Sequence, residues 1–268
     1  MEGLLQGKVA AITGSGWRMG RAACLAFARQ GARIVAADLD LARAEAVAAQ
    51  LRDQGGQAVA CRYDPAAQAS GDGLVAAAQE AFGRLDILVN NTGVAIRPRD
   101  RASPRRPARR TKPETARFYT VSVDGVETAC RAAIRQFEAQ GGGGAIVTAD
   151  LVARLTDYGS VRHDPQGSAV AILTRKLALE AAEQGTRVNA FCPAGMPTGS
   201  EDDDEGSPEV PSVRPPTPLG CVVTAEACAN AALFLASDLA ATITGVSLPV
   251  DAGLAAAAAQ RDENDRSV

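Results

Sequence analysis

Glycines and an acidic residue near the N-terminus have the spacing of a nucleotide-binding site. Residues 13–20 read Thr-Gly-Ser-Gly-Trp-Arg-Met-Gly and separate a short apolar run from an alanine-rich segment. In such a turn at a helix start, backbone N–H groups approach a pyrophosphate closely and the helix dipole adds to the attraction. Asp38 follows 18 residues after Gly20, where a carboxylate accepts hydrogen bonds from an adenosine ribose. The spacing predicts a dinucleotide site that favours NAD(H) over NADP(H).

Proton transfer is the second chemistry that the sequence suggests. His163 is the single histidine of the chain, and Asp150 precedes it by 13 residues. An imidazole titrates near neutral pH, and a neighbouring carboxylate orients such a ring. The alternative is a loop histidine without a role, because Asp164 and Pro165 are typical of a helix N-cap and a first helical residue. A helix that begins at Pro165 leaves His163 just outside it.

The elements that must position these residues alternate along the chain. Short apolar runs indicate buried strands at 8–13, 33–38, 57–62, 85–90, 145–148, 187–191 and 246–250. Helical segments fall between them, at about 19–30, 41–53, 71–82, 117–140, 165–183 and 225–236. This alternation predicts a single α/β domain of Rossmann type, with a doubly wound parallel sheet and helices on both faces.

Polar residues and glycines gather at the carboxyl ends of the predicted strands. Ligands of a doubly wound sheet bind beyond those ends. The candidate cofactor-binding residues are Gly14, Ser15, Arg18, Met19, Gly20, Asp38, Asp64, Asn91, Gly93 and Pro193.

Composition limits the classes of function. The chain has 268 residues, a net charge of −3 and no apolar run of the roughly 18 residues that span a bilayer. We therefore expect a cytoplasmic protein without a secretory signal, which binds neither membranes nor nucleic acid. The six cysteines include no Cys-x-x-Cys pair, so we expect no metal site.

Further motifs carry a resemblance to a known family. They are Gly7-Lys8-Val9, Thr13-Gly14, Asn90-Asn91-Thr92-Gly93, Arg187-Val188-Asn189-Ala190, Pro218-Leu219-Gly220 and Val250-Asp251-Ala252-Gly253. With them, residues 7–253 resemble the short-chain dehydrogenase/reductase family. The resemblance implies a seven-stranded sheet, a nicotinamide cofactor, hydride transfer between an alcohol and a carbonyl or acyl compound, and an oligomer.

The chain departs from the family at the positions of its catalytic residues. The family uses an asparagine, a serine, and a tyrosine followed four residues later by a lysine. At the corresponding positions the resemblance places Ser122, Asp150 or Leu151, His163 and Gly167. The family's tyrosine donates the proton, and its lysine lowers a hydroxyl pKa that is otherwise about 10. Replacing all four residues predicts slow carbonyl reduction.

Arg18 is a further departure, because the family has a glycine at this position of the first turn. An arginine side chain either obstructs the close approach of the pyrophosphate, which weakens cofactor binding, or pairs with the phosphate directly. The sequence leaves both alternatives open.

Two segments of opposite charge interrupt the domain, which we expect to cover residues 1–258. Residues 95–113 are an insert rich in arginine and proline, and residues 193–218 are an acidic, proline-rich loop where the family has its substrate lid. The two are either solvated loops, or attract each other across the cleft, or offer the arginines to an anionic ligand or partner. Residues 259–268 are expected to form a polar tail.

Three functions are consistent with the sequence. The first is an oxidoreductase, similar to carbonyl and acyl reductases, that works with NAD(H) through altered groups such as His163. The second is a catalytically silent subunit that pairs with an active family member. The third is a non-redox enzyme in which Asp150 and His163 transfer protons.

Overall fold

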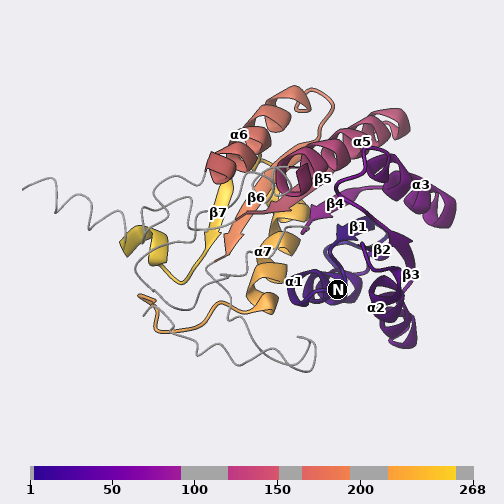
Figure 1. The fold of residues 1–268 in the computed structure, drawn as a ribbon, viewed down its shortest axis with the longest axis horizontal. Coiled ribbons are helices and arrows are strands. Elements are labelled where there is room, and N and C mark those ends of the chain that lie inside the picture. Colours follow the sequence, from indigo (N-terminus) through magenta and orange to yellow (C-terminus); the bar gives the residue numbers. More distant parts are fainter. Residues whose placement is uncertain (1–2, 92–119, 151–164, 194–216, 258–268) are drawn as a thin grey trace, which may run out of the picture.

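A seven-stranded parallel sheet forms the centre of the molecule (Figure 1). The computed structural model describes residues 3–91, 120–150, 165–193 and 217–257. Within these residues the strand order is β3-β2-β1-β4-β5-β6-β7 and every pairing is parallel. The strands are β1 (Val9–Thr13), β2 (Arg33–Asp38), β3 (Ala58–Arg62), β4 (Ile87–Asn90), β5 (Ala145–Ala149), β6 (Arg187–Pro193) and β7 (Ser247–Val250).

Helices cover both faces of the sheet (Figure 1). Those of one face are α1 (Arg18–Arg29), α2 (Leu41–Asp53) and α7 (Ala225–Ala236). Those of the other face are α3 (Ser70–Phe82), α5 (Gly125–Gln140) and α6 (Pro165–Glu180). A π-helical turn, η1 (Thr120–Asp124), precedes α5, and a 3-10 turn, η3 (Asp238–Ala240), follows α7. The predicted fold class is confirmed.

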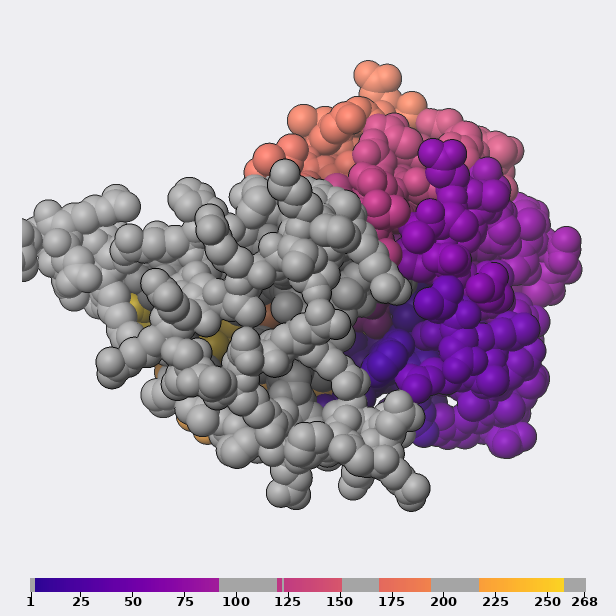
Figure 2. All heavy atoms as spheres, in the orientation of Figure 1, coloured from indigo at the N-terminus to yellow at the C-terminus, as the bar shows by residue number. Residues whose placement is uncertain are grey.

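Alternate residues of the central strands point into two separate layers of core. In β1, Ala10 and Ile12 join one apolar cluster, while Val9 and Ala11 join the other. A parallel strand that is buried on both faces needs apolar residues throughout, so its sequence reads as a continuous apolar run. In space-filling view, residues 3–91, coloured indigo to purple, lie directly beside the pink and orange region that contains α5 and α6 (Figure 2).

The element boundaries differ from the predicted ones by a few residues. The helix predicted from residue 117 is described from Thr120 and begins as the π-helical turn η1. The helix predicted to end at 183 ends at Glu180, because the N–H of Thr186 bonds to the carbonyl of Ala181 and Gly185 adopts a positive φ of 72°. The strand predicted to end at 191 continues to Pro193.

Several predicted features lie outside the described residues. They are the insert at 95–113, nearly all of the acidic loop at 193–218 and the tail at 259–268. Among the helices that are described, none combines the length and the apolar character needed to cross a bilayer.

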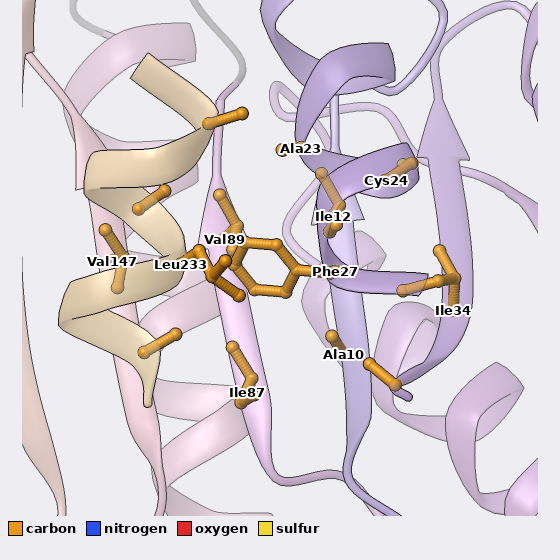
Figure 3. Packing of buried hydrophobic residues seen from close by; sticks show 14 of the residues in the cluster. Ala10, Ile12, Ala23, Cys24, Phe27, Ile34, Ile87, Val89, Val147 and Leu233 are labelled. Carbon is orange, nitrogen blue, oxygen red and sulfur yellow. The ribbon is translucent and has the colours of Figure 1, made fainter. Parts of the chain in front are cut away.

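Phe27 joins three elements of one core layer. Its side chain on α1 is fully buried, and its ring lies beside Val89 of β4 and Leu233 of α7 (Figure 3). α1 and α7 come from opposite ends of the chain, so this ring helps to fix the helix that carries the glycine-rich turn.

Replacing Phe27 with alanine should therefore destabilise the protein strongly. We expect Phe27→Ala to lower the free energy of unfolding by about 3–5 kcal/mol, because it removes buried apolar area and leaves a cavity. Urea denaturation followed by circular dichroism measures the change. Leu179→Ala, at a side chain that is 79% exposed, is the control and should change the free energy by less than about 0.5 kcal/mol. Equal losses in the two variants would contradict the described packing.

Candidate functional site

The candidate site lies where the direction of the chain crossovers reverses. β1 lies between β2 and β4 in the sheet, so the connection after β1 runs to one side and the connection leading to β4 crosses to the other. The carboxyl ends of parallel strands meet at one edge, and a crevice forms at such a switch point. Gly14 follows β1, Asp38 ends β2 and Asn91 follows β4. The fold thus brings together three predicted site residues that are distant in sequence.

The turn after β1 is shaped by two glycines. Gly14 has a φ of 63°, which favours glycine, and a Cβ on Gly20 would overlap the carbonyl oxygen of Gly14. The first turn of α1 therefore packs directly on the turn that precedes it. α1 has no acidic residue in that first turn and no side-chain cap at Trp17. Backbone N–H groups at the helix start, with the positive end of its dipole, are therefore suited to bind an anion.

Thr13 and Asn91 join the ends of β1 and β4. The hydroxyl of Thr13 accepts a hydrogen bond from the Asn91 N–H at 3.0 Å, and the Asn91 amide donates to the carbonyl of Gly14 at 3.3 Å. Two buried oxygens in this region, Ser15 Oγ and Asn91 Oδ1, have no hydrogen-bond partner among the described residues. Sequence reasoning did not select Thr13 as a site residue, although its place before Gly14 was the available signal.

Asp38 is a buried carboxylate at the end of β2. Its side chain is 3% exposed. Oδ2 accepts a hydrogen bond from the Gly16 N–H and Oδ1 accepts one from the Asp40 N–H, both at 3.0 Å. The carboxylate is therefore fixed against the glycine-rich turn. A carboxylate has about four lone-pair positions, so both oxygens can still accept further hydrogen bonds.

Arg18 and Met19 begin α1. Arg18 is exposed and has helical backbone angles, so its position does not require the glycine of the family pattern. Met19 is partly buried and packs on the core below the turn. Arg18 thus lies at the start of α1, directly after the glycine-rich turn, and both alternatives for its role stay predictions.

The other predicted site residues lie along the same edge or outside the described residues. Asp64 closes the turn before α3, where its Oδ1 accepts a hydrogen bond from the Ala66 N–H. Pro193 ends β6, and Asp150 follows β5 with 5% exposure. Ser122 belongs to η1 and Gly167 to the first turn of α6. Gly93 and His163 lie outside the described residues.

The start of α6 agrees with the prediction made for its N-terminus. The helix begins at Pro165, two residues after His163 and two before Gly167. The residue predicted to correspond to the family's lysine, Gly167, is therefore on the helix, whereas the predicted tyrosine position, residue 163, lies outside the described residues.

A buried thiol forms a hydrogen bond with the last residue of β4, next to the candidate site. Cys130 on α5 accepts a hydrogen bond from the side-chain amide of Asn90 at 3.2 Å. Burial raises the pKa of the Cys130 thiol to about 12, although hydrogen bonds with Asn90 and Thr148 act to lower it. The thiol therefore stays protonated and holds the last residue of β4 in place.

All six cysteines are described and none forms a disulfide. Within the described residues no three potential ligand side chains gather as a metal site.

Comparison with known proteins identifies the family. A family model described as enoyl-(acyl carrier protein) reductase matches residues 15–255. The chain belongs to the short-chain dehydrogenase/reductase family. Members of this family are oxidoreductases that use NAD(P).

Curated relatives and a solved structure are similar to this chain over nearly its whole length. The chain is 33% identical over 261 residues to 2,5-dichloro-2,5-cyclohexadiene-1,4-diol dehydrogenase of Sphingobium indicum, covering 94% of this chain and 98% of the relative. It is 34% identical over 257 residues to L-rhamnose 1-dehydrogenase (NAD(P)(+)) of Azotobacter vinelandii, with coverage of 94% and 98%. The crystal structure of a putative short-chain dehydrogenase/reductase from Burkholderia xenovorans matches with a TM-score of 0.77 and 31% identity, covering 95% and 98%.

The residues at the switch point fit a dinucleotide. Ser15 Oγ and Asn91 Oδ1 are buried polar atoms beside the turn, and neither has a partner in the part of the chain that is described. A Cβ on Gly14 would press against the backbone of Asn91, and one on Gly20 would overlap the carbonyl oxygen of Gly14. A phosphate or ribose group supplies the hydrogen bonds that such atoms need when buried.

Thiol chemistry provides a test of the described packing. Burial raises the pKa of the Cys24, Cys130 and Cys228 thiols, so they form almost no thiolate at pH 8. Cys221 is exposed. We expect iodoacetamide to modify Cys221 first in the native protein and the three buried thiols only after denaturation, as peptide mass spectrometry would show. Cys221→Ser, the control, should lose the fast modification. Native labelling of Cys130 at the rate of Cys221 would contradict the packing of α5.

Proposed function

We propose that the protein binds NAD(H) at the switch point between β1 and β4 and interconverts an alcohol and a carbonyl compound slowly, with altered proton-transfer groups. One observation carries the proposal. The buried oxygens of Ser15 and Asn91 and the fixed carboxylate of Asp38 form a complete cradle for a dinucleotide, whereas the family's proton-donating side chains are replaced. In the proposal, the chain thus keeps the residues that bind the cofactor and replaces those that transfer the proton.

Each end of the cradle has a distinct role in the proposal. Asp38 accepts hydrogen bonds from the adenosine ribose hydroxyls, which favours NAD(H) over NADP(H). Asp64 lies at the next strand end, toward the adenine. The start of α1, including Arg18 and Met19, faces the pyrophosphate. Asn91 with Gly93 and, farther along the edge, Pro193 border the nicotinamide, whose ring supplies or accepts the hydride when bound.

His163 and Asp150 are the proposed proton-transfer groups. An imidazole carries a proton to or from an alcohol oxygen near neutral pH without help from a lysine. Asp150, buried at the carboxyl end of β5, is the carboxylate that would orient the ring. Ser122, at the π-helical turn before α5, occupies the position of the family's asparagine. π-Helical turns occur frequently at functional sites.

The substrate class is inferred from the named relatives. They are dehydrogenases of a cyclic diol and of a sugar, and both act on small polar alcohols. We propose a small molecule with an oxidisable alcohol, or the corresponding carbonyl compound, as substrate. An oligomer of short-chain dehydrogenase/reductase subunits, of one kind or two, is part of the proposal.

Cofactor binding is the first test. NADH at 100 times its dissociation constant should stabilise the protein by about 2.7 kcal/mol, which a thermal-shift titration detects as a saturable rise in melting temperature. Gly20→Ala is the matched variant, because its added methyl group would force the turn away from α1. We expect this variant to fold with a lower melting temperature and to lose most of the NADH-dependent rise.

Restoring the family's residues is the second test. We expect the triple variant Leu151→Ser, His163→Tyr and Gly167→Lys to increase turnover of a cyclic diol or sugar alcohol with NAD⁺ by about 100-fold or more, because positioned acid–base groups contribute roughly 10²–10⁴-fold. Steady-state absorbance of NADH measures the rate. His163→Ala is the control and should reduce the residual turnover of the natural chain.

Other outcomes would favour the alternative functions. Turnover without any dinucleotide, abolished in His163→Ala, would replace the proposal with non-redox proton transfer by Asp150 and His163. Absence of any stabilisation by NADH or NADPH, together with co-purification with an active family member, would replace it with a silent partner subunit.

A further inference from the structure

Side chains from three elements meet behind the candidate site. The side-chain amide of Asn90, the last residue of β4, donates a hydrogen bond to Cys130 Sγ of α5 at 3.2 Å. The hydroxyl of Thr148, in β5, also forms a hydrogen bond with this thiol. None of the three residues is more than 2% exposed. Because a buried polar group without a partner is costly, the shared thiol constrains both strand residues.

The register of the sheet brings the two strand residues side by side. Asn90 of β4 is paired with Thr148 of β5. Val89 and Val147, the residues before them, belong to the opposite core layer (Figure 3). Since side chains alternate between the two faces of a strand, Asn90 and Thr148 both point toward the face that α5 covers. Cys130 therefore joins the carboxyl ends of β4 and β5 from a single helix.

Each of the joined residues adjoins a residue of the proposed site. Asn91 follows Asn90 directly, and Asp150 lies two residues after Thr148. In the proposed function, Asn91 borders the nicotinamide and Asp150 orients the proton-transfer group. The N–H of Asp150 donates to the carbonyl of Phe191 at 2.8 Å, so the ladder between β5 and β6 continues to this residue. A change at the thiol is therefore transmitted over one residue on β4 and over two residues on β5.

The hydrogen bonds of Cys130 distinguish it from two other buried thiols. Cys24 and Cys228 are fully buried as well. Burial raises the pKa of both thiols, and the hydrogen bonds that act against this rise come from their own backbone. Those of Cys130 come from side chains on two strands. A thiol that only fills space needs no such partners, so these contacts indicate a role in holding the strand ends.

We infer that Cys130 is a positioning residue for the nicotinamide half of the dinucleotide site. It acts through Asn90 and Thr148, whose separation it fixes, and not by contact with the dinucleotide. In the proposed function the adenosine half lies at the ends of β1 and β2, around Asp38, which the hydrogen bonds of the thiol do not reach. The inference rests on the proposed dinucleotide site and adds a residue that supports one half of it.

The affinities of the full chain for NADH and for ADP test the inference. ADP has the adenosine and both phosphates of NADH but lacks its nicotinamide half. NADH binding is followed by fluorescence titration, and ADP binding by displacement of NADH. Cys130→Ala removes the shared partner of Asn90 and Thr148, so it should raise the dissociation constant for NADH about 10-fold. The dissociation constant for ADP should change less than about twofold, because the adenosine half is distant from the substitution.

Two further variants keep the test decisive if Cys130→Ala does not fold. Cys130→Ser retains a hydroxyl that can donate and accept hydrogen bonds, so the NADH dissociation constant should stay within about threefold of that of the natural chain. Thr148→Val keeps the branched shape and removes the hydroxyl. It should weaken NADH selectively as well, and less than Cys130→Ala does, because the bond between Asn90 and Cys130 remains.

Cys228→Ala is the matched control. Cys228 is a fully buried thiol on α7, which covers the opposite face of the sheet. The substitution removes the same sulfur atom from a core and should likewise lower the melting temperature. It should leave the ratio of the two dissociation constants unchanged, because α7 does not carry the contacts between the ends of β4 and β5.

The outcomes separate the inference from the proposed function. Equal weakening of NADH and ADP in Cys130→Ala, or unchanged affinity for both, overturns the inference and leaves the dinucleotide site intact. A selective loss of NADH affinity in Cys228→Ala also overturns it, as does a Cys130→Ser variant that binds NADH as weakly as Cys130→Ala. NADH that does not bind, or that binds and is not displaced by ADP, overturns the proposed function and the inference with it.

Discussion

The contact between Gly20 and the carbonyl of Gly14 determines where every other group of the site lies. α1 can start directly above the end of β1 because Gly20 has no side chain to strike the carbonyl oxygen of Gly14. That approach sets the position of the helix start, of Ser15 and of the Gly16 N–H that holds Asp38. Phe27, farther along α1, anchors the same helix on β4 and α7. The same helix, α1, thus contributes both to the packing of the core and to the geometry of the cradle.

The cradle and the catalytic positions differ in how much of the family pattern they retain. Around the cradle, Thr13, Asn91 and Asp38 form hydrogen bonds that link three strand ends. In the proposed function, His163 and Gly167 stand at the positions of the family's tyrosine and lysine. Binding groups act mainly through the backbone and the sheet edge, whereas proton transfer depends on particular side chains. A chain can therefore keep the first while it replaces the second.

The sequence by itself determined the fold class and the strand and helix ranges to within a few residues, because apolar periodicity and glycine spacing are local properties. It also indicated the start of α6 at Pro165, since proline and its preceding residue restrict the backbone locally. The tertiary structure alone decided which strand ends meet, the support of Asn90 by Cys130, and the burial of the Ser15 and Asn91 oxygens without a partner among the described residues. It also decided the cation–π contact between Arg43 and Trp17. Contacts of this kind join residues that are distant in the chain, and no local pattern encodes which distant side chain fills a given space.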